Sequence, residues 1–199
     1  MSSSGKVKIV IGADHAGFEL KQKLITYLEG KGYEVADKGA DAYVEGDDYP
    51  DFCAPVGRMI SNHPDEMKGI VIGGSGQGEA IVCNRFPNVR ATVFNGQYKP
   101  KDERVVPEEI KLAREHNDAN VLALGARFLT EEEAISATML WLDTPFSGEE
   151  RHMRRIKKIE TSLVKKEGEE AQKSFPLMVI TGIIASITGS IILKIIGFF

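Results

Sequence analysis

Short apolar segments rich in β-branched residues alternate with segments of helical periodicity through most of this chain of 199 residues. The apolar segments run over residues 7–11, 33–37, 69–73, 90–94 and 120–125. Strands that alternate with helices in this way form parallel sheets that are covered on both faces. We therefore predict an α/β fold: a doubly wound, Rossmann-like, five-stranded parallel sheet with flanking helices.

The predicted helices show apolar residues at spacings of three and four, and several carry recognisable ends. They cover residues 18–32, 51–62, 80–86, 108–116 and 130–142. The first ends at one of two glycines, Gly30 or Gly32, and Asp51 is expected to cap the second. Thr130, with Glu133 three positions later, predicts a capping box at the start of the last.

The segment GGSGQGE, residues 73–79, joins the third predicted strand to a helix. Four glycines in six positions let the backbone turn tightly and direct N–H groups at an anion near the helix start. Glu79 is unusual there, because a carboxylate beside a bound anion is repelled unless its ionisation serves the chemistry. This combination favours an enzyme that acts on a negatively charged substrate.

Composition excludes some functions. A net charge of −4 argues against a nucleic-acid-binding protein, which would carry a basic face. The two cysteines, Cys53 and Cys83, lie in apolar segments without metal-ligand spacing, so we expect buried, reduced thiols. Neither a metal nor another cofactor is expected. The polar start, residues 1–5, lacks the apolar segment of a signal peptide and is expected to be disordered.

The end of the chain has a different character. Residues 175–193 contain 19 residues without a charge, enough for a helix of roughly 28 Å, close to the hydrocarbon thickness of a bilayer. We predict domains at 6–160 and 175–199, the second a candidate transmembrane helix, joined by a charged linker or helix extension at 161–174. Lysines in this linker favour a cytoplasmic folded domain anchored to the membrane. There are two alternatives to a transmembrane helix: a long helix buried against the domain or an oligomer partner, and a tail fused to a soluble enzyme.

Ligands of parallel sheets bind beyond the carboxyl ends of the strands, and several polar loops are expected to meet there. Asp14 and His15 follow the first predicted strand, Glu79 follows the third, and Arg127 follows the fifth. The segment REHNDAN, residues 114–120, is expected to contribute to the same place. Arg151 and Arg155 are four apart in a basic helical segment, so they share one face.

Five ordered blocks resemble the ribose-5-phosphate isomerase type B family, which includes the galactose-6-phosphate isomerase subunits of bacteria. They are GADHAGFELK (12–21), DYPDF (48–52), GGSGQGEAIVCNRFPNVRA (73–91), REHNDANVLALGAR (114–127) and RHMRRI (151–156). Together they lie within residues 6–160. Some members of this family use a cysteine two residues before the serine or threonine of the glycine loop. Gly73 occupies that position, so the resemblance is to members with a glutamate base.

The resemblance implies an aldose-ketose isomerase that interconverts ribose 5-phosphate and ribulose 5-phosphate through an enediolate. The implied catalytic residues are Glu79 as base, His116 as ring-opening acid, Ser75 and Asp14. The implied substrate-binding residues are His15, Gly74, Gly76, Gly78, Asn117, Arg127, Arg151 and Arg155. The two last arginines are expected to come from a second subunit, in a homodimer with shared active sites or a tetramer built from it.

Two alternatives remain open from the sequence. The same chemistry suits a six-carbon sugar phosphate, such as galactose 6-phosphate or allose 6-phosphate, and the hydrophobic tail suits a membrane-tethered, non-catalytic sugar-phosphate-binding module. Residues 95–113 are longer than the corresponding segment of the family. This loop is expected near the site, where it could influence the choice of sugar or form a lid.

Overall fold

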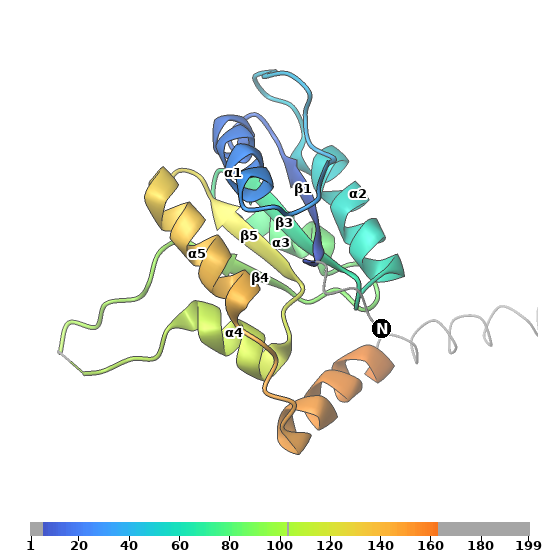
Figure 1. Ribbon diagram of the computed structural model, residues 1–199, viewed down its shortest axis with the longest axis vertical. Helices are drawn as coiled ribbons and strands as arrows, with labels where there is room; N and C mark the ends of the chain where they lie inside the picture. Colours follow the sequence, from blue (N-terminus) through green and yellow to red (C-terminus); the bar gives the residue numbers. More distant parts are fainter. Residues whose placement is uncertain (1–5, 103, 163–199) are drawn as a thin grey trace, which may run out of the picture. The chain divides into compact units, whose positions relative to one another are not determined.

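The computed structural model describes residues 6–102 and 104–162. Its centre is a sheet of parallel strands in the order β2-β1-β3-β5-β4 (Figure 1). The strands are β1 (Lys8–Ala13), β2 (Val35–Asp37), β3 (Met67–Gly73), β4 (Ala91–Phe94) and β5 (Val121–Gly125). The predicted five-stranded parallel α/β fold is confirmed.

Helices cover both faces of this sheet. They are α1 (Phe18–Gly30), α2 (Tyr49–Asn62), α3 (Gln77–Cys83), α4 (Glu109–Asn117) and α5 (Glu131–Asp143). Residues of α1, α4 and α5 belong to one apolar core, and residues of α2 and α3 belong to the other. The strand order reverses direction at β1 and β3, which is where such sheets bind ligands, at their carboxyl edge.

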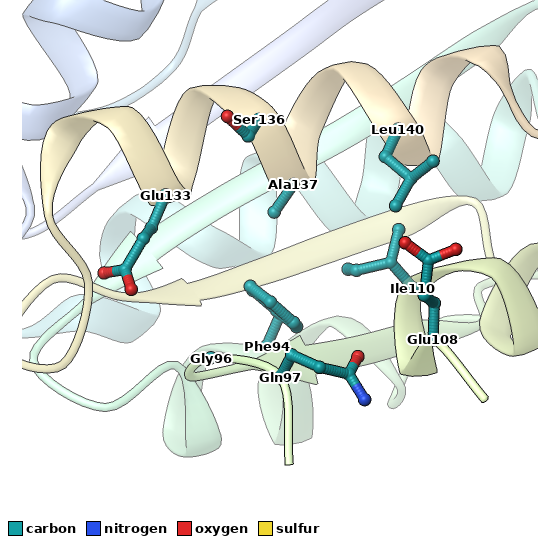
Figure 2. A pocket seen from close by; sticks show the side chains of 9 residues that line it. All are labelled: Phe94, Gly96, Gln97, Glu108, Ile110, Glu133, Ser136, Ala137 and Leu140. Atoms are coloured by element: carbon teal, nitrogen blue, oxygen red, sulfur yellow. The ribbon is translucent and has the colours of Figure 1, made fainter. Parts of the chain in front are cut away.

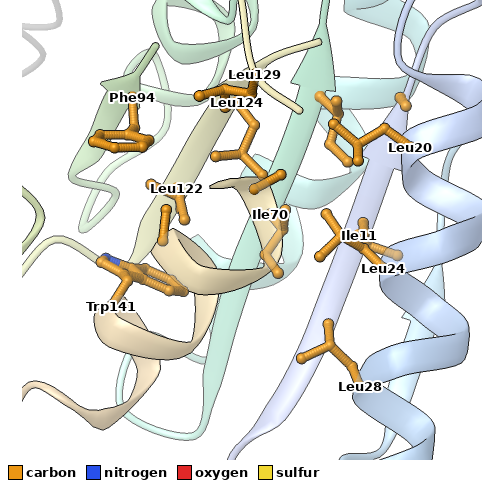
Figure 3. Close-up of a cluster of buried hydrophobic side chains, with 14 of the residues drawn as sticks. Ile11, Leu20, Leu24, Leu28, Ile70, Phe94, Leu122, Leu124, Leu129 and Trp141 are labelled. Carbon is orange, nitrogen blue, oxygen red and sulfur yellow. The ribbon is translucent and has the colours of Figure 1, made fainter. Parts of the chain in front are cut away.

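The first core lies between the sheet and the helices α1 and α5 (Figure 3). Leu20, Leu24 and Leu28 of α1 are spaced by four, so they form one buried stripe, and Trp141 of α5 is fully buried. The second core includes Cys53 and Cys83, both free and fully buried as predicted. Burial raises the pKa of the Cys83 thiol to about 12, so this thiol is protonated and unreactive at neutral pH.

Two helices begin earlier than predicted. The N-cap of α2 is Asp48, which corrects the expected cap at Asp51, because Pro50 fits the first turn, where no backbone N–H is required. Helix α3 begins at Gln77 because Gly76 ends the loop with a left-handed backbone, φ 74°. Glu79 therefore lies in the first turn of α3. The capping box of Thr130 and Glu133 is confirmed.

The chain divides into two compact units, Met1–Met153 and Arg154–Phe199. Residues 150–162 are helical. Within the described part of the chain, no helix is both long and apolar enough to cross a membrane. The predicted membrane helix at 175–199 lies outside the described residues, as do residues 1–5 and most of the predicted linker.

Candidate active site

The glycine-rich loop runs from the end of β3 into α3, at the carboxyl edge of the sheet. A Cβ atom on Gly76 would lie 3.2–3.3 Å from backbone atoms of β5, so the loop passes close to this strand. The segment after β5 binds the same loop. Ala126 donates its backbone N–H to the carbonyl of Gly73 (2.8 Å), and Arg127 donates its backbone N–H to the carbonyl of Gly74 (3.2 Å). The loop is therefore held in place by its neighbouring strand.

Glu79 is 4% exposed, and its carboxylate lies against the backbone of Gly73. A Cβ atom on Gly73 would be 1.7 Å from Oε1 of Glu79 and 2.3 Å from its Cδ. A cysteine at position 73 would thus collide with the glutamate, so the two side chains exclude each other in this geometry. Burial raises the pKa of Glu79, the charge of Asp14 acts in the same direction, and the backbone N–H of Glu79 itself opposes them.

Asp14 and His15 follow β1 at the same edge. Oδ1 of Asp14 accepts hydrogen bonds from the N–H groups of Ala16 (3.0 Å) and Gly17 (3.2 Å), which fixes this buried side chain. Nδ1 of His15 lies 4.0 Å from Oδ2 of Asp14. The carboxylate of Asp14 therefore acts electrostatically on both Glu79 and His15.

Arg127 completes this cluster. A Cβ atom on Gly74 would lie 3.0 Å from the guanidinium carbon of Arg127, so this exposed side chain reaches across the glycine loop. Its charge also acts on His15. The structure thus brings together the following predicted residues: Asp14, His15, Gly74, Ser75, Gly76, Gly78, Glu79 and Arg127.

His116 and Asn117 lie elsewhere. They end α4, which leads into the amino end of β5, and Arg90 just before β4 donates from Nε to the carbonyl of Asn117 (3.0 Å). At about 3.3 Å per residue, the five residues of β5 separate this edge from the glycine loop by roughly 16 Å. The expectation that this segment joins Glu79 within one chain is wrong, because a helix that precedes a strand ends at the strand's amino edge.

The ring of His116 packs against His152, with ring centroids 4.3 Å apart. His152 is buried, and its Nδ1 lies 2.9 Å from the hydroxyl oxygen of Ser147. Arg151, which precedes His152, is exposed and paired with Glu149 (2.7 Å). Arg155 is an exposed residue of the second unit, so its predicted role stays a prediction.

Three residues at the carboxyl edge were not predicted as functional. Oδ1 of Asp47 lies 2.6 Å from Nδ1 of His15, and Nδ2 of Asn95 donates to the carbonyl of Ser75 (3.0 Å). Tyr49 lies over the start of α3, since a Cβ atom on Gly78 would be 2.9 Å from its hydroxyl oxygen. For Asp47 and Tyr49, the signal in the sequence was the segment DDYP, residues 47–50, in which an acidic pair precedes an aromatic residue.

One group among the described residues has a spacing that a metal ion could use. Asp14, His15 and Asp47 each offer one suitable atom, and these atoms lie within 4.8 Å of one another. Nδ1 of His15, however, already makes a hydrogen bond of 2.6 Å to Asp47. We therefore assign the group to a hydrogen-bonded cluster of side chains.

A separate pocket of about 240 Å³ lies between α4, α5 and the start of the long loop (Figure 2). Its lining is largely apolar, with Phe94, Ile110, Ala137 and Leu140 facing one another in Figure 2. Gln97 at its margin ties the two ends of the loop, because it donates to the carbonyl of Pro107 (3.1 Å) and accepts from the N–H of Glu109 (3.1 Å). The predicted site residues do not line this pocket.

Comparison with known proteins gives a consistent result. The profile of the family described as Ribose/Galactose Isomerase matches residues 9–159. "Ribose-5-phosphate isomerase B" of Mycolicibacterium paratuberculosis is 40% identical over 150 residues, which are 75% of this chain and 87% of that protein. The Escherichia coli protein of the same name is 36% identical over 152 residues, 76% of this chain and 93% of its own length.

Solved structures agree. The crystal structure of ribose-5-phosphate isomerase B from Mycoplasma genitalium with bound ribulose-5-phosphate has a TM-score of 0.70 and 34% identity, and the match covers 78% of this chain and 95% of that one. The enzyme from Clostridium thermocellum has a TM-score of 0.70 and 38% identity, with 80% and 99% covered. From the matching profile and these relatives, the chain belongs to the ribose/galactose isomerase family.

Proposed function

We propose that residues 6–160 form an aldose-ketose isomerase that interconverts D-ribose 5-phosphate and D-ribulose 5-phosphate, with Glu79 as the base. The observation that carries this proposal is the buried carboxylate of Glu79 beside the glycine loop, with its pKa raised by burial. A carboxylate with a raised pKa accepts a proton more readily, as a general base near neutral pH must. The names of the relatives support the five-carbon substrate.

The reaction moves hydrogen within the substrate and needs no oxidant. Glu79 takes the proton from C2 of the open-chain aldose, and the C–H electron pair forms the C1–C2 double bond of an enediolate as charge moves to O1. Glu79 then returns the proton to C1, and the hydroxyl hydrogen of O2 is transferred to O1. A ketone at C2 and an alcohol at C1 result.

The developing charge on oxygen needs donors that are already in place. In this proposal, the hydroxyl of Ser75 and the backbone amides of Gly74, Gly76 and Gly78 hold the substrate oxygens and the enediolate. The hydrogen bonds from the segment after β5 support this role, because they keep the loop rigid. Asp14, whose orientation is fixed by two backbone N–H groups, orients the substrate hydroxyls.

The phosphate is assigned to His15 and Arg127, which offer positive charge at the same edge. His116, the proposed acid for ring opening, lies at the far edge of its own sheet, as does Asn117. We therefore infer a homodimer with shared active sites, in which His116, Asn117, Arg151 and Arg155 serve the site of the partner subunit. Arginines one helical turn apart suit bidentate phosphate binding.

A purely binding module would have no use for a buried base, because an uncompensated carboxylate beside a phosphate weakens binding. The test is turnover by the full chain of ribose 5-phosphate, beside galactose 6-phosphate and allose 6-phosphate. The proposal expects ribulose 5-phosphate to form with the highest kcat/KM of the three. Binding of all three sugars without product, or preference for a six-carbon sugar, would reject it.

A further inference from the structure

Asp47 makes two hydrogen bonds to one residue of the proposed phosphate site. Its Oδ1 accepts the backbone N–H of His15 (2.9 Å) and lies 2.6 Å from Nδ1 of the His15 ring. The two residues are 32 positions apart, and Asp47 comes from the loop between β2 and α2. We propose that Asp47 is a positioning residue that holds His15 in its protonated form, with Nε2–H left to donate to the phosphate of the substrate.

The carboxylate of Asp47 lies in surroundings that favour a positively charged partner. Its side chain is only 11% exposed, and its second oxygen, Oδ2, is buried without a hydrogen-bond partner among the described residues. A buried carboxylate oxygen without a donor is costly unless a positive charge lies next to it. A protonated His15 supplies that charge at 2.6 Å, so the pair is more stable with an imidazolium than with a neutral ring.

Charged groups face His15 from three parts of the described fold. Asp14 approaches from the end of β1, Asp47 from the loop before α2, and Arg127 from the segment after β5. The hydrogen bond to Asp47 is the largest influence and raises the pKa of His15; the charges of both aspartates also raise it, while partial burial and Arg127 lower it. The ring of Tyr43 meets His15 edge-on, with centroids 6.2 Å apart, and adds no charge.

The loop that carries Asp47 is anchored at its start to α1 and β1. Lys21 of α1 is fully buried, and its ammonium group donates to Oδ2 of Asp37 (2.6 Å) and to the carbonyl of Ala40 (2.9 Å). Gly39 passes so close to β1 that a Cβ atom there would lie 2.6 Å from the nitrogen of Ala13. This anchoring fixes the start of the loop against β1, from which His15 follows.

The inference rests on the proposed function, because it assigns His15 to the phosphate of the sugar substrate. Sugar phosphates are mostly dianions above about pH 6, since the second pKa of a phosphate monoester is near that value. A histidine of ordinary pKa would lose most of its positive charge in the same range. The pair with Asp47 keeps the cation up to a higher pH, so substrate affinity persists at neutral and mildly alkaline pH.

The experiment compares Asp47→Asn with Asp48→Asn in the full chain. Asp48 is the matched control: it is the exposed neighbour, and it caps α2 without a side-chain hydrogen bond. We expect Asp47→Asn to raise KM for ribose 5-phosphate about tenfold at pH 8, the worth of one charge-assisted hydrogen bond, and much less at pH 6, with kcat within about twofold. Asp48→Asn is expected to leave both constants unchanged.

A second measurement does not depend on turnover. The imidazole of His15, assigned with His15→Gln, is titrated by NMR in the parent and in Asp47→Asn. We expect the midpoint to fall in Asp47→Asn and to stay in Asp48→Asn. An unchanged midpoint overturns the inference even if isomerase activity is found, whereas a lowered midpoint in a chain without isomerase activity rejects the proposed function and leaves the Asp47–His15 pair established.

The double variant His15→Gln/Asp47→Asn separates positioning from a general effect on the loop. If Asp47 acts through His15, its substitution adds nothing to the KM of His15→Gln, because the two residues are coupled. A further rise in KM of the double variant, or a KM increase in Asp47→Asn that is equal at pH 6 and pH 8, would show that Asp47 only supports the loop.

Discussion

The carboxylate of Glu79 occupies the space in which a side chain at position 73 would stand. A Cβ atom on Gly73 would lie 1.7 Å from Oε1 of Glu79, whereas real non-bonded carbon and oxygen atoms stay about 3 Å apart. Glycine at the end of β3 and glutamate in the first turn of α3 are therefore one structural unit. Position 73 can change only if the glutamate moves.

This relationship predicts the effect of Gly73→Ala. The added methyl group pushes the carboxylate of Glu79 from its position, and a displacement of about 1 Å in a catalytic group costs on the order of 100-fold in rate. Steady-state kcat for ribose 5-phosphate is the readout. Gly30→Ala is the control, because Gly30 ends α1 with open space around it. Parental kcat in Gly73→Ala would show that the position of Glu79 is not critical.

The buried charge of Glu79 is expected to lower the stability of the fold. Its pKa in the folded protein is raised, so the folded state binds this proton more tightly than the unfolded state, and stability is lost as pH rises through the folded pKa. The neutral amide introduced by Glu79→Gln resembles the protonated carboxyl group, so this variant should have a higher Tm than the parent at neutral pH. The gain should vanish at low pH, where the parent is protonated too. A Tm below the parent at every pH would contradict this reasoning.

Lys21 should matter to stability more than exposed lysines do. Lys21→Met removes the donor to Asp37 and Ala40, which we expect to reduce the free energy of unfolding by about 1–3 kcal/mol in a urea titration. Lys23→Met is the comparison, since the pair of Lys23 with Glu131 is largely exposed and solvent screens its attraction. Equal losses in the two variants would speak against a special role for the buried pair.

Shared active sites predict complementation between two inactive variants. Glu79→Gln and His116→Asn remove groups from opposite edges of the sheet, so a mixed dimer has one intact site and one site with both defects. Random exchange makes half of the dimers mixed, and each mixed dimer has one working site of its two. The mixture should therefore recover about a quarter of parental activity. If native mass spectrometry shows mixed dimers but activity stays at the level of either variant, the sites are not shared.

Much of the fold could be predicted because its signals are local. The strands are short β-branched segments, and the capping box of Thr130 lies within four residues of sequence. The position of Glu79 directly after the glycine loop could be predicted for the same reason, since loop and glutamate are contiguous in the sequence. The pairing of Asp47 with His15 could not be predicted, because the two residues are 32 positions apart and only the packed loop brings them together.

The position of His116 was mispredicted for a different reason. The segment REHNDAN, residues 114–120, ends where β5 begins, and a parallel strand carries the chain from one edge of the sheet to the other. The order of elements already held this signal: side chains just before a strand lie at its amino edge, and side chains just after it lie at its carboxyl edge. Arg127, which follows β5, was placed correctly by that rule.

The central claim is that Glu79 moves the proton between C2 and C1. The most direct test is kcat/KM for ribose 5-phosphate in the parent and in Glu79→Gln between pH 4.5 and 8. We predict that parental activity falls on the acid side with a midpoint above 4.5, the ordinary value, because Glu79 must be ionised to act. Glu79→Gln should lose about 1,000-fold or more at every pH. Activity of Glu79→Gln within tenfold of the parent would contradict the account.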